Sequence, residues 1–157
     1  MTVVPQRKRP AVRSSVGDHL QITDRGRPRS DRNFLRRVVR AALEHGGAMQ
    51  MPVSLLLTDD DEIAQIHADF LGDATPTDVI SFALDGAAEL VVSVETAARC
   101  ARERGHTVRA EVALYVVHGL LHLCGHDDKG VRARARMRAA ERAVLSSLGI
   151  AIDDVDA

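Results

Sequence analysis

Apolar residues recur at helical spacing in several segments of the chain. Between Asp31 and His45 they fall three and four positions apart, as on the buried face of an amphipathic helix, and Gly46 follows as a stop signal. Ser30 or Asp31 is the expected N-cap. The same criteria predict further helices from Thr58 or Asp59 to Gly72, from Val94 to about Gly105, from about Arg109 to Cys124, and from about Lys129 to Leu148.

Four short apolar runs between the helices predict strands, over residues 19–23, 52–57, 79–82 and 89–93. An acidic run at residues 59–62 is explained more simply by a helix N-terminus than by a metal site. Strands and helices alternate, but the strands are few and short, and no internal repeat marks a second domain. The pattern therefore predicts an α+β fold, a small single-domain sandwich in which a short mixed β-sheet of about four strands packs with about five helices.

His118 and His122 stand four positions apart in the most apolar of the predicted helices. Both imidazoles then project from one face, and a buried imidazole needs a partner because an unsatisfied polar group costs about 1–3 kcal/mol. Gly125 allows the chain to fold back, which brings Asp128 within reach as a third ligand. Two packed, hydrogen-bonded histidines are the ordinary interpretation of a bare pair. The glycine and the acids that follow favour a metal site on this central helix, with one coordination position left open as in catalytic zinc sites.

Gly119 sets the motif apart from zinc peptidases of the His-Glu-x-x-His type. Those enzymes carry their general base directly after the first histidine, and glycine has no side chain that takes a proton. The motif therefore indicates a reaction other than peptide cleavage, or a base supplied from elsewhere in the chain.

Composition narrows the class of protein further. The 157 residues suffice for one domain, and 45% hydrophobic but only 3% aromatic residues predict an aliphatic core. A formal net charge of -1 gives no overall attraction to polyanions, so nucleic-acid binding needs a local patch. Cys100 and Cys124 lack metal or redox spacing, which fits free thiols in the cytoplasm. No membrane-length apolar run or signal-peptide pattern is present, and we expect a cytoplasmic protein without a membrane partner.

Basic residues are concentrated in two segments. Residues 1–16 are predicted to form a flexible basic arm, which is either a solvated extension or an RNA contact, ahead of a single domain over residues 17–157. In the last predicted helix, Arg134, Arg138 and Arg142 share one stripe at four-residue spacing. They are either phosphate contacts near the metal or part of an ordinary solvated helix face.

Three blocks of the sequence resemble the YbeY family of rRNA maturation factors, which are small bacterial metal-dependent endoribonucleases. Residues 118–128, His-Gly-Leu-Leu-His-Leu-Cys-Gly-His-Asp-Asp, are similar to the family signature His-Gly-x-Leu-His-Leu-x-Gly-(Tyr/His)-Asp-His. Residues 75–82 resemble its Pro-Thr-Asp-Val-Leu-Ser-Phe strand, and residues 89–93 resemble its Gly-Asp-Ile-x-Ile-Ser strand. Met137 and Glu141 also stand where the closing helix of the family commonly has Met and Glu. The resemblance extends over about residues 52–148.

The resemblance implies one zinc ion per chain, with His118, His122 and Asp128 as its ligands. It implies a single-strand-specific endoribonuclease that processes small-subunit rRNA and takes part in ribosome quality control. Single-stranded RNA and the small ribosomal subunit are then the expected partners, and a ribosomal protein or a GTPase is a further candidate.

Three positions depart from the family pattern. Asp128 replaces a histidine, and its negative charge would make a bound metal less Lewis-acidic. His126 is the alternative third ligand if the chain stays near-helical through Gly125. Leu71 stands where the family usually has an arginine associated with holding RNA phosphate, and His67 stands where it usually has asparagine.

The expected chemistry is the attack of a metal-activated water on an RNA phosphodiester. Asp78 and His126 are the candidates for proton handling or for support of the metal ligands, and Asp78 is equally suited to tying its loop. Two other functions stay open. One is a metal-dependent hydrolase of another substrate, and the other is a non-catalytic, metal-containing ribosome-binding factor, which the leucine at position 71 favours.

Overall fold

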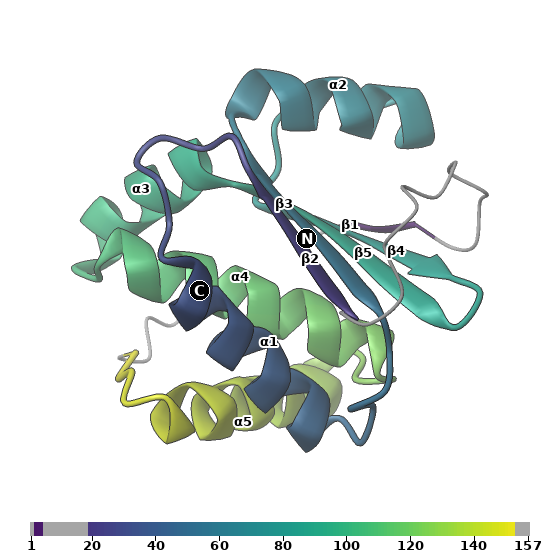
Figure 1. Cartoon of the computed structure of the whole chain (residues 1–157), viewed down its shortest axis with the longest axis vertical. Helices are drawn as coiled ribbons and strands as arrows, with labels where there is room; N and C mark the ends of the chain where they lie inside the picture. The colour runs from purple at the N-terminus through teal and green to yellow at the C-terminus, as the bar shows by residue number, and fades with distance from the viewer. Residues whose placement is uncertain (1, 5–18, 153–157) are drawn as a thin grey trace.

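The computed structural model describes residues 2–4 and 19–152 (Figure 1). Within these residues, five strands form one sheet and five helices pack around it. The strands are β1 (Thr2–Val4), β2 (Leu20–Asp24), β3 (Val53–Thr58), β4 (Val79–Leu84) and β5 (Ala87–Ser93). The helices are α1 (Arg32–His45), α2 (Asp60–Leu71), α3 (Val94–Arg104), α4 (Val108–Leu123) and α5 (Val131–Ser147).

The sheet is mixed, with the strand order β1-β4-β5-β3-β2. Strands β4 and β5 form an antiparallel hairpin, and the other neighbouring pairs run parallel. The predicted α+β class and mixed sheet are confirmed, and the expected helices end within a few residues of those observed. Of the two N-cap candidates predicted for each of α1 and α2, Asp31 and Asp59 are the caps, because their side chains accept backbone hydrogen bonds.

Strand β1 is a fifth strand beyond the about four that the sequence analysis expected, and it lies within the segment expected to form a flexible basic arm over residues 1–16. Thr2–Val4 pairs in parallel with residues 80–82 of β4 and forms the fifth strand. A run of only three residues carries no period that would reveal a strand. Residues 5–18 lie outside the described part of the chain, so the rest of the predicted arm and the domain boundary at residue 17 stay predictions.

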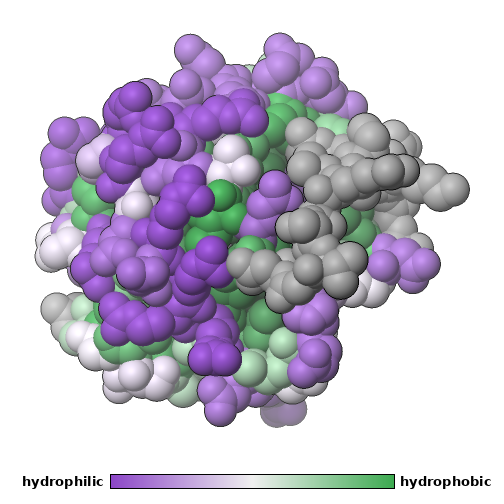
Figure 2. All heavy atoms as spheres, viewed as in Figure 1, coloured by the Kyte–Doolittle hydropathy of each residue, from purple (hydrophilic) through white to green (hydrophobic). Residues whose placement is uncertain are grey.

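The helices form two layers of unequal thickness on the two faces of the sheet. Figure 1 shows α2 on one face and α1, α3, α4 and α5 on the other. Alternation along the strands divides the core accordingly: Leu55 and Leu57 of β3 point to the thicker layer, and Leu56 points to α2. Figure 2 shows hydrophilic residues over most of the face seen in Figure 1, with hydrophobic residues visible between them. No helix of the described residues is both long and apolar enough to cross a membrane.

Helix α4 lies at the centre of the thicker layer, against the sheet and between α1, α3 and α5. Gly119 makes the close approach to the sheet possible. A Cβ atom at this position would lie 2.7 Å from Leu90 Cδ2 and 2.8 Å from Ser81 Oγ. Ser81 is fully buried, and its hydroxyl has no hydrogen-bond partner among the described residues. Gly119 stands where zinc peptidases carry their general base. A side chain at this position would also collide with the sheet.

We expect Gly119→Ala to lower the free energy of unfolding by about 1–2 kcal/mol, because overpacking outweighs the helix propensity gained. Urea denaturation of the native protein and the variant measures the difference. Ala139→Gly, at an exposed position of α5, is the control for propensity alone and should cost about 1 kcal/mol. A Gly119→Ala protein as stable as the native one would show that the close approach relaxes without cost.

The Asp60 side chain links the start of α2 to the neighbouring helix α3 through hydrogen bonds. Its carboxylate accepts hydrogen bonds from Ser93 Oγ at 2.5 Å, Thr96 Oγ1 at 2.7 Å and Arg99 at 2.6 Å. Burial by itself would raise the pKa of this carboxyl. The hydrogen bonds from Arg99, Ser93 and Thr96 outweigh burial, and the Asp60 pKa lies below its ordinary value of 3.8.

We expect Asp60→Asn to destabilise the protein by about 1–3 kcal/mol at neutral pH. Because the folded-state pKa is depressed, this contribution is fully present above the ordinary value of 3.8 and is lost as the pH falls through the folded-state value. Denaturation curves at a series of pH values should therefore converge for the two proteins in acid. Asp61→Asn, on the exposed side of the same turn, should change stability by less than about 0.5 kcal/mol. A difference for Asp60→Asn that is independent of pH would contradict this account.

Candidate metal centre

The structure brings the two histidines of α4 together with Asp128 from the loop before α5. Their potential ligand atoms all lie within 4.8 Å of one another. Asp128 Oδ1 is 3.3 Å from His122 Nε2, and its Oδ2 is 3.9 Å from His118 Nε2. The three side chains are 15%, 21% and 39% exposed for His122, His118 and Asp128. The group is thus open to solvent on the side of the carboxylate.

The turn after α4 directs Asp128 toward the histidines. Gly125 has φ +103°, a conformation that favours glycine, and the His126 N–H donates to the Leu121 carbonyl at 3.0 Å. The Asp127 carboxylate then accepts hydrogen bonds from the next two backbone N–H groups at 2.7 and 3.0 Å. This Asx turn folds the chain back so that the following carboxylate faces α4.

The donor set fits one divalent ion. Zinc–nitrogen and zinc–oxygen bonds of about 2.0–2.2 Å in a tetrahedron place neighbouring ligand atoms roughly 3.3 Å apart. The 3.3 Å between Asp128 Oδ1 and His122 Nε2 agrees with that value, and the 3.9 Å between Asp128 Oδ2 and His118 Nε2 is somewhat longer. Two imidazole nitrogens and one carboxylate are a common ligand set of catalytic zinc sites, in which a fourth position stays open.

Glu141 of α5 contacts His118 through Nδ1, the ring nitrogen that does not face Asp128. Its carboxylate makes this contact, and its side chain is only 12% exposed. With Nδ1–H donating to Glu141, the Nε2 lone pair of His118 is directed to the side of Asp128. A carboxylate that fixes the tautomer of a ligating histidine in this way is the usual support of a metal site. In the sequence, Glu141 is singled out only because the closing helix of the family commonly has Glu at this position. Its place on the apolar face of α5, next to buried Met137 and Val144, is the local signal that points to it.

The protonation state of Asp128 also suits metal binding. Partial burial would raise the pKa of its carboxyl, but hydrogen bonding to His122 and the charges of His122 and His118 outweigh burial and lower it below the ordinary value of 3.8. Asp128 is therefore ionised at neutral pH, in the form that binds cations.

The two candidates for proton handling lie outside the three-residue group. The Asp78 carboxylate accepts from Val79 N at 2.7 Å and Thr77 Oγ1 at 3.3 Å, as expected of a residue that ties the start of β4. The His126 ring lies beside His45 at the end of α1, with 6.2 Å between ring centroids. Of the two third ligands considered, the geometry thus favours Asp128 over His126. The roles of Asp78 and His126 in proton transfer stay predictions.

The two departures on α2 have different surroundings. His67 is buried, and its Nδ1 lies 2.9 Å from the Thr75 carbonyl oxygen, so it joins α2 to the loop that precedes β4. Leu71, in the last turn of α2, is 39% exposed. An apolar side chain therefore stands on the surface where the resemblance expects an arginine.

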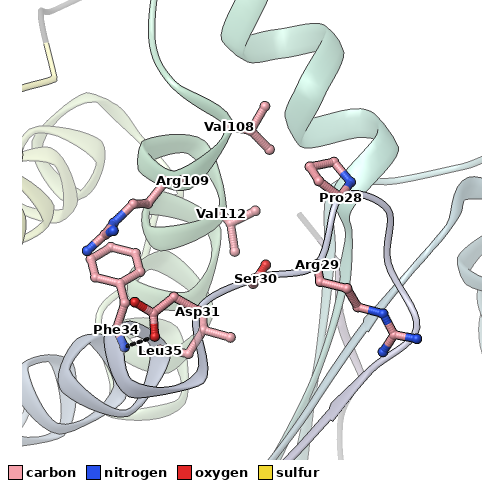
Figure 3. Close-up of a pocket in the computed structure, with 9 residues that line it drawn as sticks. All are labelled: Pro28, Arg29, Ser30, Asp31, Phe34, Leu35, Val108, Arg109 and Val112. Carbon is pink, nitrogen blue, oxygen red and sulfur yellow. Dashed lines mark hydrogen bonds between the residues drawn. The ribbon is translucent and has the colours of Figure 1, made fainter.

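A separate pocket of about 270 Å³ lies at the other end of α4, between the N-terminal ends of α1 and α4 (Figure 3). The Arg109 guanidinium lies over the Phe34 ring, 3.8 Å from its centroid. Arg29 points away from the pocket and donates to the Asp24 carbonyl. His118 and His122 are in the C-terminal half of α4, and Asp128 is in the loop that follows this end of the helix, so this pocket is distinct from the metal centre.

The fold and this site define a small α+β protein with a candidate metal centre on its central helix. A family model described as Endoribonuclease YbeY matches residues 21–149. Endoribonuclease YbeY of Moorella thermoacetica is 36% identical over 133 residues, which cover 74% of this chain and 85% of the relative. The relative of that name in Rhodopirellula baltica is 42% identical over 120 residues, 72% of this chain and 61% of the relative. The chain belongs to the YbeY family of endoribonucleases, as the sequence motifs indicated.

A solved structure supports the fold independently. The solution structure of TM1509 from Thermotoga maritima matches with a TM-score of 0.61, over 87% of this chain and 97% of that one. The two chains are 23% identical, so this likeness is evidence for the shared architecture alone.

We expect Glu141→Gln to weaken zinc binding about 10- to 100-fold, because the amide no longer holds the proton on His118 Nδ1 as strongly. Competition with a zinc chelator measures the affinity. Glu103→Gln removes an exposed carboxylate of α3 and should leave the affinity unchanged. An unaltered affinity in Glu141→Gln would show that the contact with His118 does not support the site.

Proposed function

We propose that this protein is a zinc-dependent endoribonuclease that cleaves single-stranded RNA during maturation of small-subunit rRNA. The observation that carries the proposal is the grouping of His118, His122 and Asp128, with Glu141 behind His118, in a chain of the YbeY family. The relatives named above are endoribonucleases by name, which supports RNA as the substrate.

In this proposal each residue of the site has a defined task. His118 and His122 bind the ion through Nε2, Asp128 supplies an anionic oxygen, and Glu141 keeps the His118 proton on Nδ1. When bound, zinc supplies Lewis acidity and lowers the pKa of a coordinated water toward neutrality. His126, in the same turn as Asp128, and Asp78, at the start of β4, are the candidates for handling protons.

The cellular setting is part of the proposal. The small ribosomal subunit would present the RNA, with a ribosomal protein or a GTPase as a further partner, and the enzyme would act in the cytoplasm and in ribosome quality control. Family membership supports this setting. The two cysteines are free thiols, which agrees with a reducing compartment.

One alternative function keeps a specific observation in its favour. Leu71 is exposed at the position where the resemblance expects an arginine, which would suit a ribosome-binding factor that retains the metal without cleaving RNA. The peptidase alternative is weakened, because Gly119 leaves no room for a glutamate on the sheet side of α4.

We expect about one zinc per chain in the native protein, a sharp loss of zinc in Asp128→Ala, and at least about a tenfold loss of RNA cleavage with it. Elemental mass spectrometry and a single-stranded RNA cleavage assay measure the two quantities. Asp85→Ala, at an exposed position between β4 and β5, is the matched control and should change neither.

Cleavage that persists undiminished after complete removal of metal would falsify the proposed mechanism. Zinc retention and co-sedimentation with small ribosomal subunits, without cleavage of any RNA, would instead establish the binding-factor alternative.

A further inference from the structure

Helix α5 carries an excess of positive charge beside the candidate metal centre. Its 17 residues include five arginines, all exposed, and one acid, Glu141. That acid is engaged with His118. The excess is local, because the whole chain has a formal net charge of -1.

The contact between Glu141 and His118 shows which side of α5 faces the metal centre. Successive residues of a helix are rotated by about 100°, so Arg134 and Arg138 lie about 20° and about 60° from the direction of Glu141. Arg132 and Arg136 lie about 180° and about 140° away, on the opposite side. These four arginines of α5 therefore fall into an inner pair beside the metal centre and an outer pair turned away from it.

Both side chains of the inner pair are exposed and thus accessible to a ligand. Met137, between the two arginines in sequence, is buried in the core, whereas Arg134 and Arg138 are exposed at the edge of the same helix face. Within the described residues, neither guanidinium takes part in a hydrogen bond or an ion pair with another side chain. The loop that carries Asp128 leads directly into this helix.

We propose that Arg134 and Arg138 form a phosphate-binding site that positions the backbone of single-stranded RNA at the metal centre. The proposal rests on the proposed function and specifies the surface that carries the substrate. A guanidinium presents a planar fork of donors that matches phosphate oxygens, and it keeps its charge at any physiological pH. Neither Glu141 nor Asp128 forms an ion pair with these guanidinium groups, because Glu141 contacts His118 and Asp128 faces both histidines.

The two pairs allow a matched comparison. Arg134→Gln/Arg138→Gln and Arg132→Gln/Arg136→Gln remove the same charge from the same helix, at exposed positions where stability should change by less than about 0.5 kcal/mol per site. Thermal unfolding verifies this for both. Binding of a fluorescently labelled single-stranded RNA oligonucleotide is then measured by anisotropy in EDTA, over salt concentrations from about 50 to about 200 mM.

Removal of one arginine that binds a phosphate of a single strand should reduce the slope of log K against log salt by about 0.7. We expect the inner double variant to lower the slope by about 1.4 and the affinity on the order of tenfold, with the outer double variant close to the native protein. Equal reductions in the two double variants would mean general electrostatic attraction and would overturn the proposal. An unchanged inner variant would overturn it as well.

Cleavage by the zinc-loaded proteins separates this inference from the proposed function. Native protein that cleaves RNA, together with an inner variant that binds normally, would refute the phosphate site and leave the nuclease intact. Native protein that never cleaves RNA, together with a reduced slope in the inner variant alone, would refute the nuclease and support the phosphate site as part of an RNA-binding surface.

Discussion

The contact between α4 and the sheet at Gly119 is the constraint on which the rest of the molecule depends. Leu90 and Ser81 lie so close beneath this residue that a side chain of any size would collide with them. The contact fixes the rotation of α4 about its own axis. With Gly119 turned to the sheet, His118 and His122 are turned toward α5 and the loop before it, where Glu141 and Asp128 meet them. Tight packing on one side of the helix thereby orients the chemical groups on the other.

Much of the fold follows from patterns within single segments. Caps such as Asp31 and Asp59, and the apolar spacing behind them, are local signals that indicate a helix without knowledge of its neighbours. Strand β1 could not be found in this way, because three residues are too few for a pattern and its pairing with β4 joins distant parts of the chain. Local signals thus identify the helices and the longer strands, whereas the edge strand β1 is recognised only in the assembled sheet.

The candidate site was predictable to a similar extent. Helical spacing alone places His118 and His122 on one face. The choice between Asp128 and His126 depends on the turn that Asp127 organises, which spacing does not describe. The contact between Glu141 and His118 joins two helices, so the family position anticipates it, whereas the pattern of either helix alone does not predict it.

The four side chains of the candidate site all come from helices α4 and α5 and the loop that joins them. They are His118, His122, Asp128 and Glu141. The site is therefore short-range in sequence, and its assembly requires closure of a single small loop. An ion bound by α4 and the loop would hold the two helices of this hairpin together. Its binding free energy would therefore add to the local stability of α5. Occupancy of the centre would then set how readily the last helix opens, while the sheet beneath stays folded.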